Sequence, residues 1–138
     1  MKLQMTKLLL TLTGLIFFSN FAFSQFTLKI KITDLRNNAG KVMLQLFDGK
    51  EKIITREMND ITEKGCLFTI TNLKAGTYAV RFYHDENLNQ KMETNIAGKP
   101  TEGYGFSNNV TGKFSMPPFE KWIFSLKADT TIVLKTVY

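Results

Sequence analysis

The chain has 138 residues, a formal net charge of +6, one cysteine and one histidine. Its basic residues stand singly between apolar positions, without a basic run or an aromatic RNA-binding motif, so we expect no nucleic-acid binding. One cysteine, Cys66, excludes an intramolecular disulfide, and one cysteine with one histidine is too few for a zinc site. Because Leu67 and Phe68 follow it, we expect Cys66 to be a small buried hydrophobe.

The first 24 residues carry the three parts of a secretory signal peptide. In order, these are the basic Lys2 and Lys7, the apolar stretch Leu8–Phe18, and the small residues Ala22 and Ser24 before a cut at Gln25. The apolar stretch has about 11 residues, whereas a helix that spans a bilayer needs about 18 to 20. We therefore expect a cleaved signal peptide over residues 1–24 and a secreted or periplasmic single domain over residues 25–138, with no stable membrane span.

Two segments with alternating apolar and polar residues follow, which is the pattern of half-buried strands. Apolar side chains stand at every second position from Phe26 to Ile32 and again from Val42 to Leu46. Residues 36–40 between these segments have turn chemistry, so we expect the two runs to pair with each other. Residues 49–65 are polar and mixed, and the sequence leaves their secondary structure open.

Four more short runs complete the pattern of strands. They are Cys66–Thr71, Thr77–Tyr83, Trp122–Lys127 and Thr130–Val137. A turn over residues 72–76 is expected between the first two, and a hinge at Ala128 and Asp129 is expected to make a pair of the last two. In the second run Tyr78, Val80 and Phe82 share one face.

About seven short strands, and no 3.6-residue apolar stripe after Gln25, predict an all-β domain. The favoured architecture is an antiparallel two-sheet sandwich of the immunoglobulin-like or transthyretin-like type, and a barrel is the alternative. One long connection, residues 85–120, interrupts the strands. Its aromatic content indicates that it is ordered, and the aromatic residues are Tyr104, Phe106, Phe114 and Phe119.

Side-chain oxygens recur at alternate positions at the start of this connection. The set consists of Asp85, Asn87, Asn89 and Glu93, with the backbone carbonyl of Lys91. This spacing matches an EF-hand calcium loop, but Gln90 stands where that loop has glycine and Ile96 where it has a bidentate glutamate, so any calcium site should be weak. The alternative is a loop held by Asx-type turns at Asn87, Asn89 and Asn95. The sequence leaves both open.

Catalytic residues have no clear signature in this chain. His84, the sole histidine, continues the apolar face of its strand, which favours a structural role over a catalytic one. Ser107 and Cys66 lack the local pattern of an activated nucleophile. Three carboxylates of the long connection are candidates for a glycosidase-like pair, namely Asp85, Glu93 and Glu102. We expect the domain not to be an enzyme, with a small carboxylate-based hydrolase as the minor alternative.

Several segments resemble the bacterial secreted proteins grouped as domain of unknown function 2141 (DUF2141). They are Gly76–Val80, His84–Glu93, Gly98–Asn108 and Pro117–Phe119, with Tyr138. Gln90 departs from the glycine of the family pattern, and Glu93 departs from its aspartate. The resemblance implies an exported β-sandwich domain and supplies no activity, substrate or catalytic residue. Residues 73–80 are also similar to transthyretin-like and carboxypeptidase-regulatory-like sandwiches, which serve mainly as structural or binding modules.

The expected function is that of a non-enzymatic binding or interaction module with residues 84–119 as its functional loop. Its partner would be an extracytoplasmic protein or a carbohydrate, because exposed aromatic rings stack on sugars and dock into partners. The surface residues expected to serve this role are His84, Glu102, Tyr104, Phe106 and Phe119. Two alternatives stay open: the aromatic rings could roof one end of the sandwich, and the domain could be a calcium-stabilised structural one.

Overall fold

The computed structural model describes residues 24–112 and 115–138, so the signal peptide expected over residues 1–24 lies outside the described residues except for Ser24. In chain order these residues form β1 (Gln25–Thr33), β2 (Lys41–Asp48), β3 (Ile53–Asp60), β4 (Cys66–Lys74), β5 (Gly76–Asp85), β6 (Tyr104–Phe106), the 3₁₀ helices η1 (Ser107–Asn109) and η2 (Phe119–Lys121), β7 (Phe124–Leu126) and β8 (Thr130–Lys135). No helix in this part of the chain is long and apolar enough to cross a membrane.

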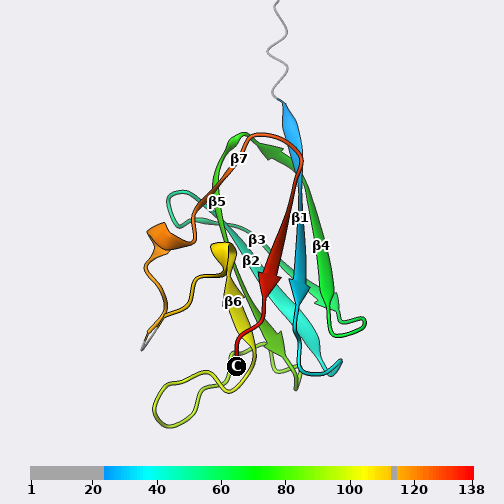
Figure 1. The fold of residues 1–138 in the computed structure, drawn as a ribbon, viewed down its shortest axis with the longest axis vertical. Helices are drawn as coiled ribbons and strands as arrows, with labels where there is room; N and C mark the ends of the chain where they lie inside the picture. Colours follow the sequence, from blue (N-terminus) through cyan, green and yellow to red (C-terminus); the bar gives the residue numbers. More distant parts are fainter. Residues whose placement is uncertain (1–23, 113–114) are drawn as a thin grey trace, which may run out of the picture.

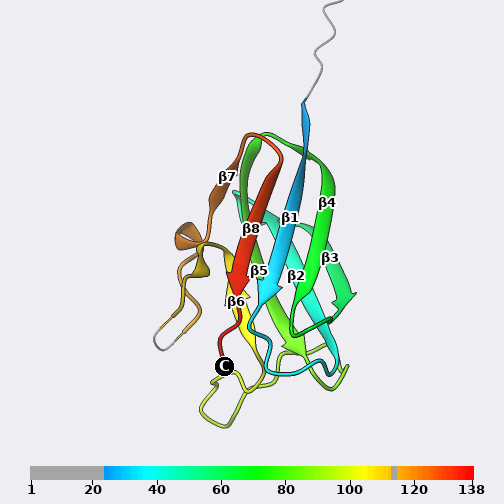
Figure 2. The same ribbon diagram turned by 45° about the vertical axis from the view of Figure 1, so that its right-hand side comes forward.

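The strands form two sheets that lie face to face, as Figure 1 and Figure 2 show. The smaller sheet has the order β4-β1-β8. The larger one has the order β3-β2-β5-β6. β7 pairs with the first residues of β5, and β6 pairs with residues farther along the same side of β5. The all-β two-sheet sandwich is therefore confirmed. The described residues hold eight strands instead of about seven, and β1 pairs with β8 in parallel while the other pairs are antiparallel.

Side chains at alternate positions of both sheets fill the space between them. In β2 and β5 the even-numbered residues point inward, as the alternation predicts, and Val42, Leu44, Val80 and Phe82 are at most 2 % exposed. The smaller sheet contributes Leu28, Ile30, Ile32, Phe68, Ile70 and Leu134 to the same cluster. Burying one such side chain stabilises the fold by about 1.5–3 kcal/mol, so this cluster is the main source of stability.

Cys66 belongs to this core and is 6 % exposed, which confirms the prediction of a small buried hydrophobe. Burial, helped by the negative charge of Asp60, raises the pKa of its thiol to about 11. The thiol is therefore protonated and unreactive at neutral pH.

The first two alternating runs do not pair with each other, so that prediction is wrong. β1 pairs with β4 and β8, whereas β2 pairs with β3 and β5 in the opposite sheet. The connection over residues 34–40 crosses between the sheets, and Gly40 permits the crossing with a φ of +69° at a point where a Cβ atom would collide with the backbone oxygen of Asp85. Alternation shows which face of a strand is buried and does not identify the strand's partner.

The predicted hairpin about Ala128 and Asp129 is also wrong. β7 is shorter than the alternating run and pairs with β5, while the chain crosses to the other sheet and β8 pairs with β1. Asp129 fastens this crossing, because its Oδ1 accepts a hydrogen bond from the backbone amide of Thr27 at 2.8 Å. Ala128 and Asp129 thus connect the two sheets instead of forming a hairpin within one sheet.

Two further segments differ from the regular strand pattern. Residues 49–65, whose secondary structure the sequence leaves open, contain β3, whose alternate residues are only half-buried. Because β3 is an edge strand with polar residues on both faces, it lacks the apolar alternation of the other strands. Residues 72–76, predicted to be a turn, continue β4 as far as Lys74, and Asn72 forms a bulge there with a φ of +61°.

A second, smaller core lies on the outer face of the larger sheet. The odd-numbered residues Phe47 and Ala79 point to this face, and Phe106 and Trp122 pack on them. Trp122 is fully buried, and its ring centroid lies 4.9 Å from those of Phe106 and Phe119 and 5.6 Å from that of Phe47. Tyr104, Phe106 and Phe119 therefore cover a sheet face and do not roof one end of the sandwich, whereas Phe114 lies outside the described residues.

Candidate functional site

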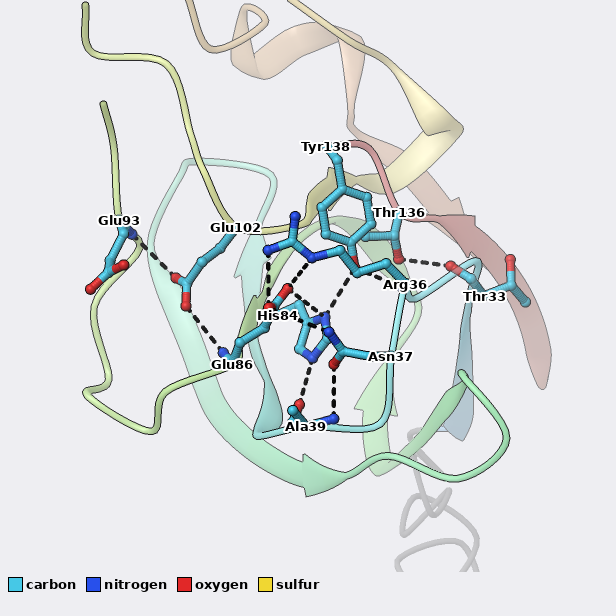
Figure 3. Close-up of polar contacts among 10 residues, drawn as sticks. All are labelled: Thr33, Arg36, Asn37, Ala39, His84, Glu86, Glu93, Glu102, Thr136 and Tyr138. Carbon is cyan, nitrogen blue, oxygen red and sulfur yellow. Dashed lines mark hydrogen bonds and ion pairs between the residues drawn. The ribbon is translucent and has the colours of Figure 1, made fainter. Parts of the chain in front are cut away.

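A buried polar cluster lies where β5 ends (Figure 3). His84 is fully buried, with its Nε2 at 2.6 Å from the carbonyl oxygen of Ala39 and its Nδ1 at 3.0 Å from the hydroxyl of Tyr138. That hydroxyl accepts a hydrogen bond from the backbone amide of Arg36 at 2.9 Å. A carbonyl oxygen can only accept, so Nε2 carries a proton and donates to Ala39, while Nδ1 is hydrogen-bonded to Tyr138 and lies 3.6 Å from Oε1 of Glu86. Both ring nitrogens are thus used within the fold.

An ion pair adjoins this cluster and joins two connections of the chain. Arg36 donates from Nε to Oε1 of Glu86 at 2.7 Å and from Nη2 to Oε2 at 2.9 Å, and its guanidinium lies 4.7 Å from the ring centroid of Tyr138. Partial burial acts to raise the pKa of Glu86, but the hydrogen bonds from Arg36 and Asn37 outweigh it and lower that pKa. The pair ties the link between β1 and β2 to the segment after β5.

Two buried carboxylates hold the segment from residue 86 to residue 103. Asp85 accepts one backbone amide on each oxygen, at 3.1 and 2.8 Å, from the residues four and five positions ahead. Glu102 accepts the amides of Glu86 and Glu93 in the same way, at 3.1 and 3.2 Å (Figure 3). A glycosidase-like pair requires two carboxylates that face a common substrate, whereas Asp85 and Glu102 turn both oxygens to the backbone.

The asparagines of this segment accept backbone hydrogen bonds, which confirms the predicted Asx-type turns. Asn87, Asn89 and Asn95 each accept the amide of the residue two positions ahead, at 3.1, 2.8 and 2.9 Å. In the case of Asn89 that donor is Lys91. The side-chain amides of Asn87 and Asn89 also donate to Oε1 of Glu93, at 2.8 and 2.9 Å. The side chains expected to bind calcium are thus hydrogen-bonded within the loop.

This arrangement does not fit a cation. Side-chain oxygens of the expected ligands face N–H groups, and in the described residues no group of three His, Cys, Asp or Glu side chains is placed to hold a metal. Gln90 adopts a φ of +60°, the backbone conformation that glycine supplies in an EF-hand loop, so the sharp turn forms without glycine. Calcium binding stays a prediction from the sequence alone.

Glu102→Ala is expected to release the segment 86–103 without unfolding the sandwich. The amides of Glu86 and Glu93 lose an ionised acceptor, which costs about 1.5–3 kcal/mol per hydrogen bond. We expect hydrogen exchange at these two amides, measured by NMR, to speed up at least tenfold. The control is Glu120→Ala, an exposed acid in the same long connection, whose side chain makes no hydrogen bond within the described residues. Equal exchange in both variants contradicts the anchoring role.

A pocket of about 690 Å³ lies between the outer face of the larger sheet and the long connection. Gln45, Arg81 and Tyr83 line it from β2 and β5, and Tyr104 and Phe106 from β6. Residues between 92 and 100 form one wall, and residues 112 and 115–117 form another. The volume is within the range of about 300–1,000 Å³ that is usual for small-molecule sites.

Strand register places the sheet residues of this pocket in two rows. Directly paired residues point to the same side of a sheet, and Arg81 pairs with Gln45 on β2 and with Phe106 on β6. Two positions along β5, Tyr83 pairs with Tyr104. One row therefore carries a cation, an amide and the ring of Phe106, and the neighbouring row carries two tyrosine rings.

Arg81 is the half-buried cation of the pocket. Its Nε donates to Oε1 of Gln45 at 2.6 Å, and its guanidinium lies 5.2 Å from the ring centroid of Phe47. Its Nη1 lies 3.9 Å from Sδ of Met116, which is a weak acceptor. Burial, together with the positive charge of Arg56, lowers the pKa of Arg81. Within the described residues no carboxylate forms an ion pair with this guanidinium.

Comparison with known proteins supplies a family for the chain. A model of the family described as "Uncharacterized protein conserved in bacteria (DUF2141)" matches residues 30–133. The chain belongs to this family. The match confirms the resemblance drawn from the sequence motifs. No curated protein matches the chain.

In this DUF2141 chain, the motif residues 102–108 build the structure around β6. A Cβ atom on Gly105 would lie 2.5 Å from the ring of Phe82 and 2.9 Å from the backbone oxygen of Lys135, so only glycine lets β6 approach the core this closely. Ser107 is fully buried, and its Oγ accepts the amide of Val80 at 2.9 Å and donates to the carbonyl of Trp122. Ser107 therefore links strands and is not an accessible nucleophile.

The predicted functional surface overlaps the pocket only in part. Tyr104 and Phe106 line the pocket, whereas His84 and Glu102 belong to the hydrogen-bonded network and Phe119 packs in the aromatic cluster. Sequence reasoning does not find Gln45, Arg81 and Tyr83, because they belong to strands and not to the long connection. The signal that was available is their alternation with core residues, which places them on the outer face of their strands.

Proposed function

We propose that this DUF2141 chain is an exported, non-enzymatic binding module, and that the pocket on the outer face of the larger sheet is its ligand site. The observation that carries the proposal is the pocket itself, which is concave, largely apolar and furnished with a few polar side chains. Sites of this kind, with apolar walls and a small number of polar groups that orient the ligand, are typical of small-molecule recognition.

Three features support a small molecule over a protein or carbohydrate partner. The pocket lies between a sheet and a folded segment instead of forming a flat patch. Phe106 is only 8 % exposed, and Phe119 packs against Trp122, so neither ring offers a free platform for a sugar. The long connection also forms walls of the pocket, so residues 84–119 would take part in ligand binding, as their unusual length suggests.

The non-enzymatic part of the proposal is supported by titratable side chains that are hydrogen-bonded within the fold and so are not available for catalysis. His84, Asp85 and Glu102 are buried and hydrogen-bonded to the chain itself, and none of them lines the pocket. The export part is supported by the signal-peptide pattern of residues 1–24.

A fragment screen by NMR tests this proposal. Isotope-labelled residues 25–138, which contain every strand of the structure, are titrated with mixtures of small acids, amines, neutral aromatics and sugars. We expect at least one class to shift the amides of Arg81, Tyr83 and Tyr104 and to leave the amides of β1 and β4 unchanged, with the fragment recovered intact. Shifts confined to the smaller sheet, or the absence of any saturable shift, would contradict the proposed site.

A further inference from the structure

We propose that the ligand of this pocket is a small organic carboxylate with a flat apolar body, and that its carboxylate pairs with the guanidinium of Arg81. This inference rests on the proposed function and adds the chemical class of the ligand. It follows from the position of one arginine, from its unused donors and from the charge and shape of its surroundings.

Arg81 is held in a fixed orientation within the pocket. It lies on the central strand β5, where backbone pairing on both sides restricts its position. The hydrogen bond from Nε to Gln45 and the contact with the Phe47 ring restrict the side chain as well. A cation that is fixed before binding loses little conformational entropy when it pairs with an anion.

Most of the hydrogen-bonding capacity of this guanidinium is not used within the described residues. An arginine has five N–H donors, and Arg81 uses Nε for Gln45 and one Nη1 contact for the sulfur of Met116. A half-buried guanidinium without a carboxylate partner is costly, and an anion in the pocket would offset that cost. A planar carboxylate matches the fork of an arginine, because two parallel hydrogen bonds form.

The lining of the pocket complements a single negative charge. Among the described residues that line it, the charged ones are Arg81 and Lys99, and none is acidic. A phosphate usually takes several cations or backbone amides, whereas one fixed guanidinium with one lysine suits a monoanion. Burial, with the charges of Asp85 and Glu102, raises the pKa of Tyr83, so its hydroxyl remains a donor at neutral pH.

The remaining lining residues define the body of the ligand. Tyr83, Tyr104 and Phe106 supply aromatic rings beside Arg81, and Met92 and Met116 supply flexible apolar side chains from the two walls. Aromatic rings favour offset or edge contacts with another flat ring, and methionine adapts to irregular shapes. An aromatic or similarly flat carboxylic acid therefore satisfies both ends of the pocket.

The test compares 2-naphthoate with its neutral amide, 2-naphthamide, by NMR titration of residues 25–138. The two probes have the same flat body, and only the first carries a charge. We expect the naphthoate to bind at least tenfold more tightly, because hydrogen bonds to a charged group are stronger than neutral ones. Both probes should shift the amides of Tyr83 and Tyr104.

Two variants separate the role of Arg81 from a general effect of charge. Arg81→Gln should reduce the affinity for naphthoate at least tenfold and leave that for naphthamide within about twofold. Arg56→Gln removes the same charge from the same row of the sheet, where Arg56 pairs with Gln45 but does not line the pocket, and should leave both affinities within about twofold. Arg81→Lys, which keeps the charge without the fork, should give an intermediate value.

Each outcome of the titration decides between the proposals. Equal binding of the two probes by the wild-type protein overturns the carboxylate inference and leaves the binding module standing. A matching loss in Arg56→Gln overturns the inference too, since surface charge would then explain the preference. If no probe or fragment reaches the pocket, both proposals fail. The wild-type comparison needs no variant, so it remains decisive even where Arg81→Gln fails to fold.

Discussion

Trp122→Ala is expected to lower the free energy of unfolding by about 3–5 kcal/mol, the usual cost of removing a fully buried large aromatic side chain. Trp122 is 0 % exposed and fills the centre of the second core, with Phe47 beneath it and Phe106 and Phe119 around it. Its indole N–H also donates to the carbonyl of Pro117 at 3.2 Å. Urea unfolding followed by far-ultraviolet circular dichroism measures the change, because the variant lacks the only tryptophan and thus its fluorescence.

Trp122→Phe is the matched control for this experiment. It keeps a ring in the cluster and removes only the larger indole and its N–H, so we expect less than half of the loss. A loss below about 1 kcal/mol in Trp122→Ala would show that the outer cluster does not belong to the cooperative fold. In that case the wall of the pocket would also lack a rigid support, because Phe106 contributes to both.

The alternation of the sequence predicts which side chains are buried, and it does so well for β1, β2 and β5. Leu28, Ile30 and Ile32 are fully buried, as their spacing indicates. The same pattern does not predict that β1 lies between β4 and β8, because strand pairing is set by the paths of the connections. The link over residues 34–40 crosses between sheets, and one of its backbone contacts, that of Arg36 with Tyr138, joins residues 102 positions apart in the chain.

The loop and the pocket differ in how far the sequence predicts them. Asn87, Asn89 and Asn95 form the predicted turns, because an asparagine that bonds to the backbone two residues ahead depends only on local geometry. The pocket depends on a long segment folding back over Arg81 and Tyr83, and no local pattern encodes that path. Trp122, which the sequence places at the start of a strand, instead precedes β7 and covers the outer sheet face.

Tyr138→Phe is expected to destabilise the fold by about 1–3 kcal/mol, which is the cost of leaving a buried polar group without its partner. The change removes one hydroxyl, which within the described residues is the hydrogen-bond partner of Nδ1 of the fully buried His84 and the acceptor for the backbone amide of Arg36. Chemical unfolding monitored by tryptophan fluorescence measures the loss. The control is Tyr104→Phe, whose hydroxyl makes no hydrogen bond within the described residues and whose removal should cost less than about 0.5 kcal/mol.

A second background shows whether the cost arises at the histidine. In a His84→Leu protein the ring that hydrogen-bonds to the Tyr138 hydroxyl is absent, so adding Tyr138→Phe should cost clearly less than it does in the wild type. The amide of Arg36 lies near the surface and can turn to water, which leaves Nδ1 of His84 as the main source of the penalty. An equal cost in both backgrounds would mean that the hydroxyl stabilises the chain through Arg36 and not through His84. The two results thus distinguish a histidine held by Tyr138 from one that merely lies beside it.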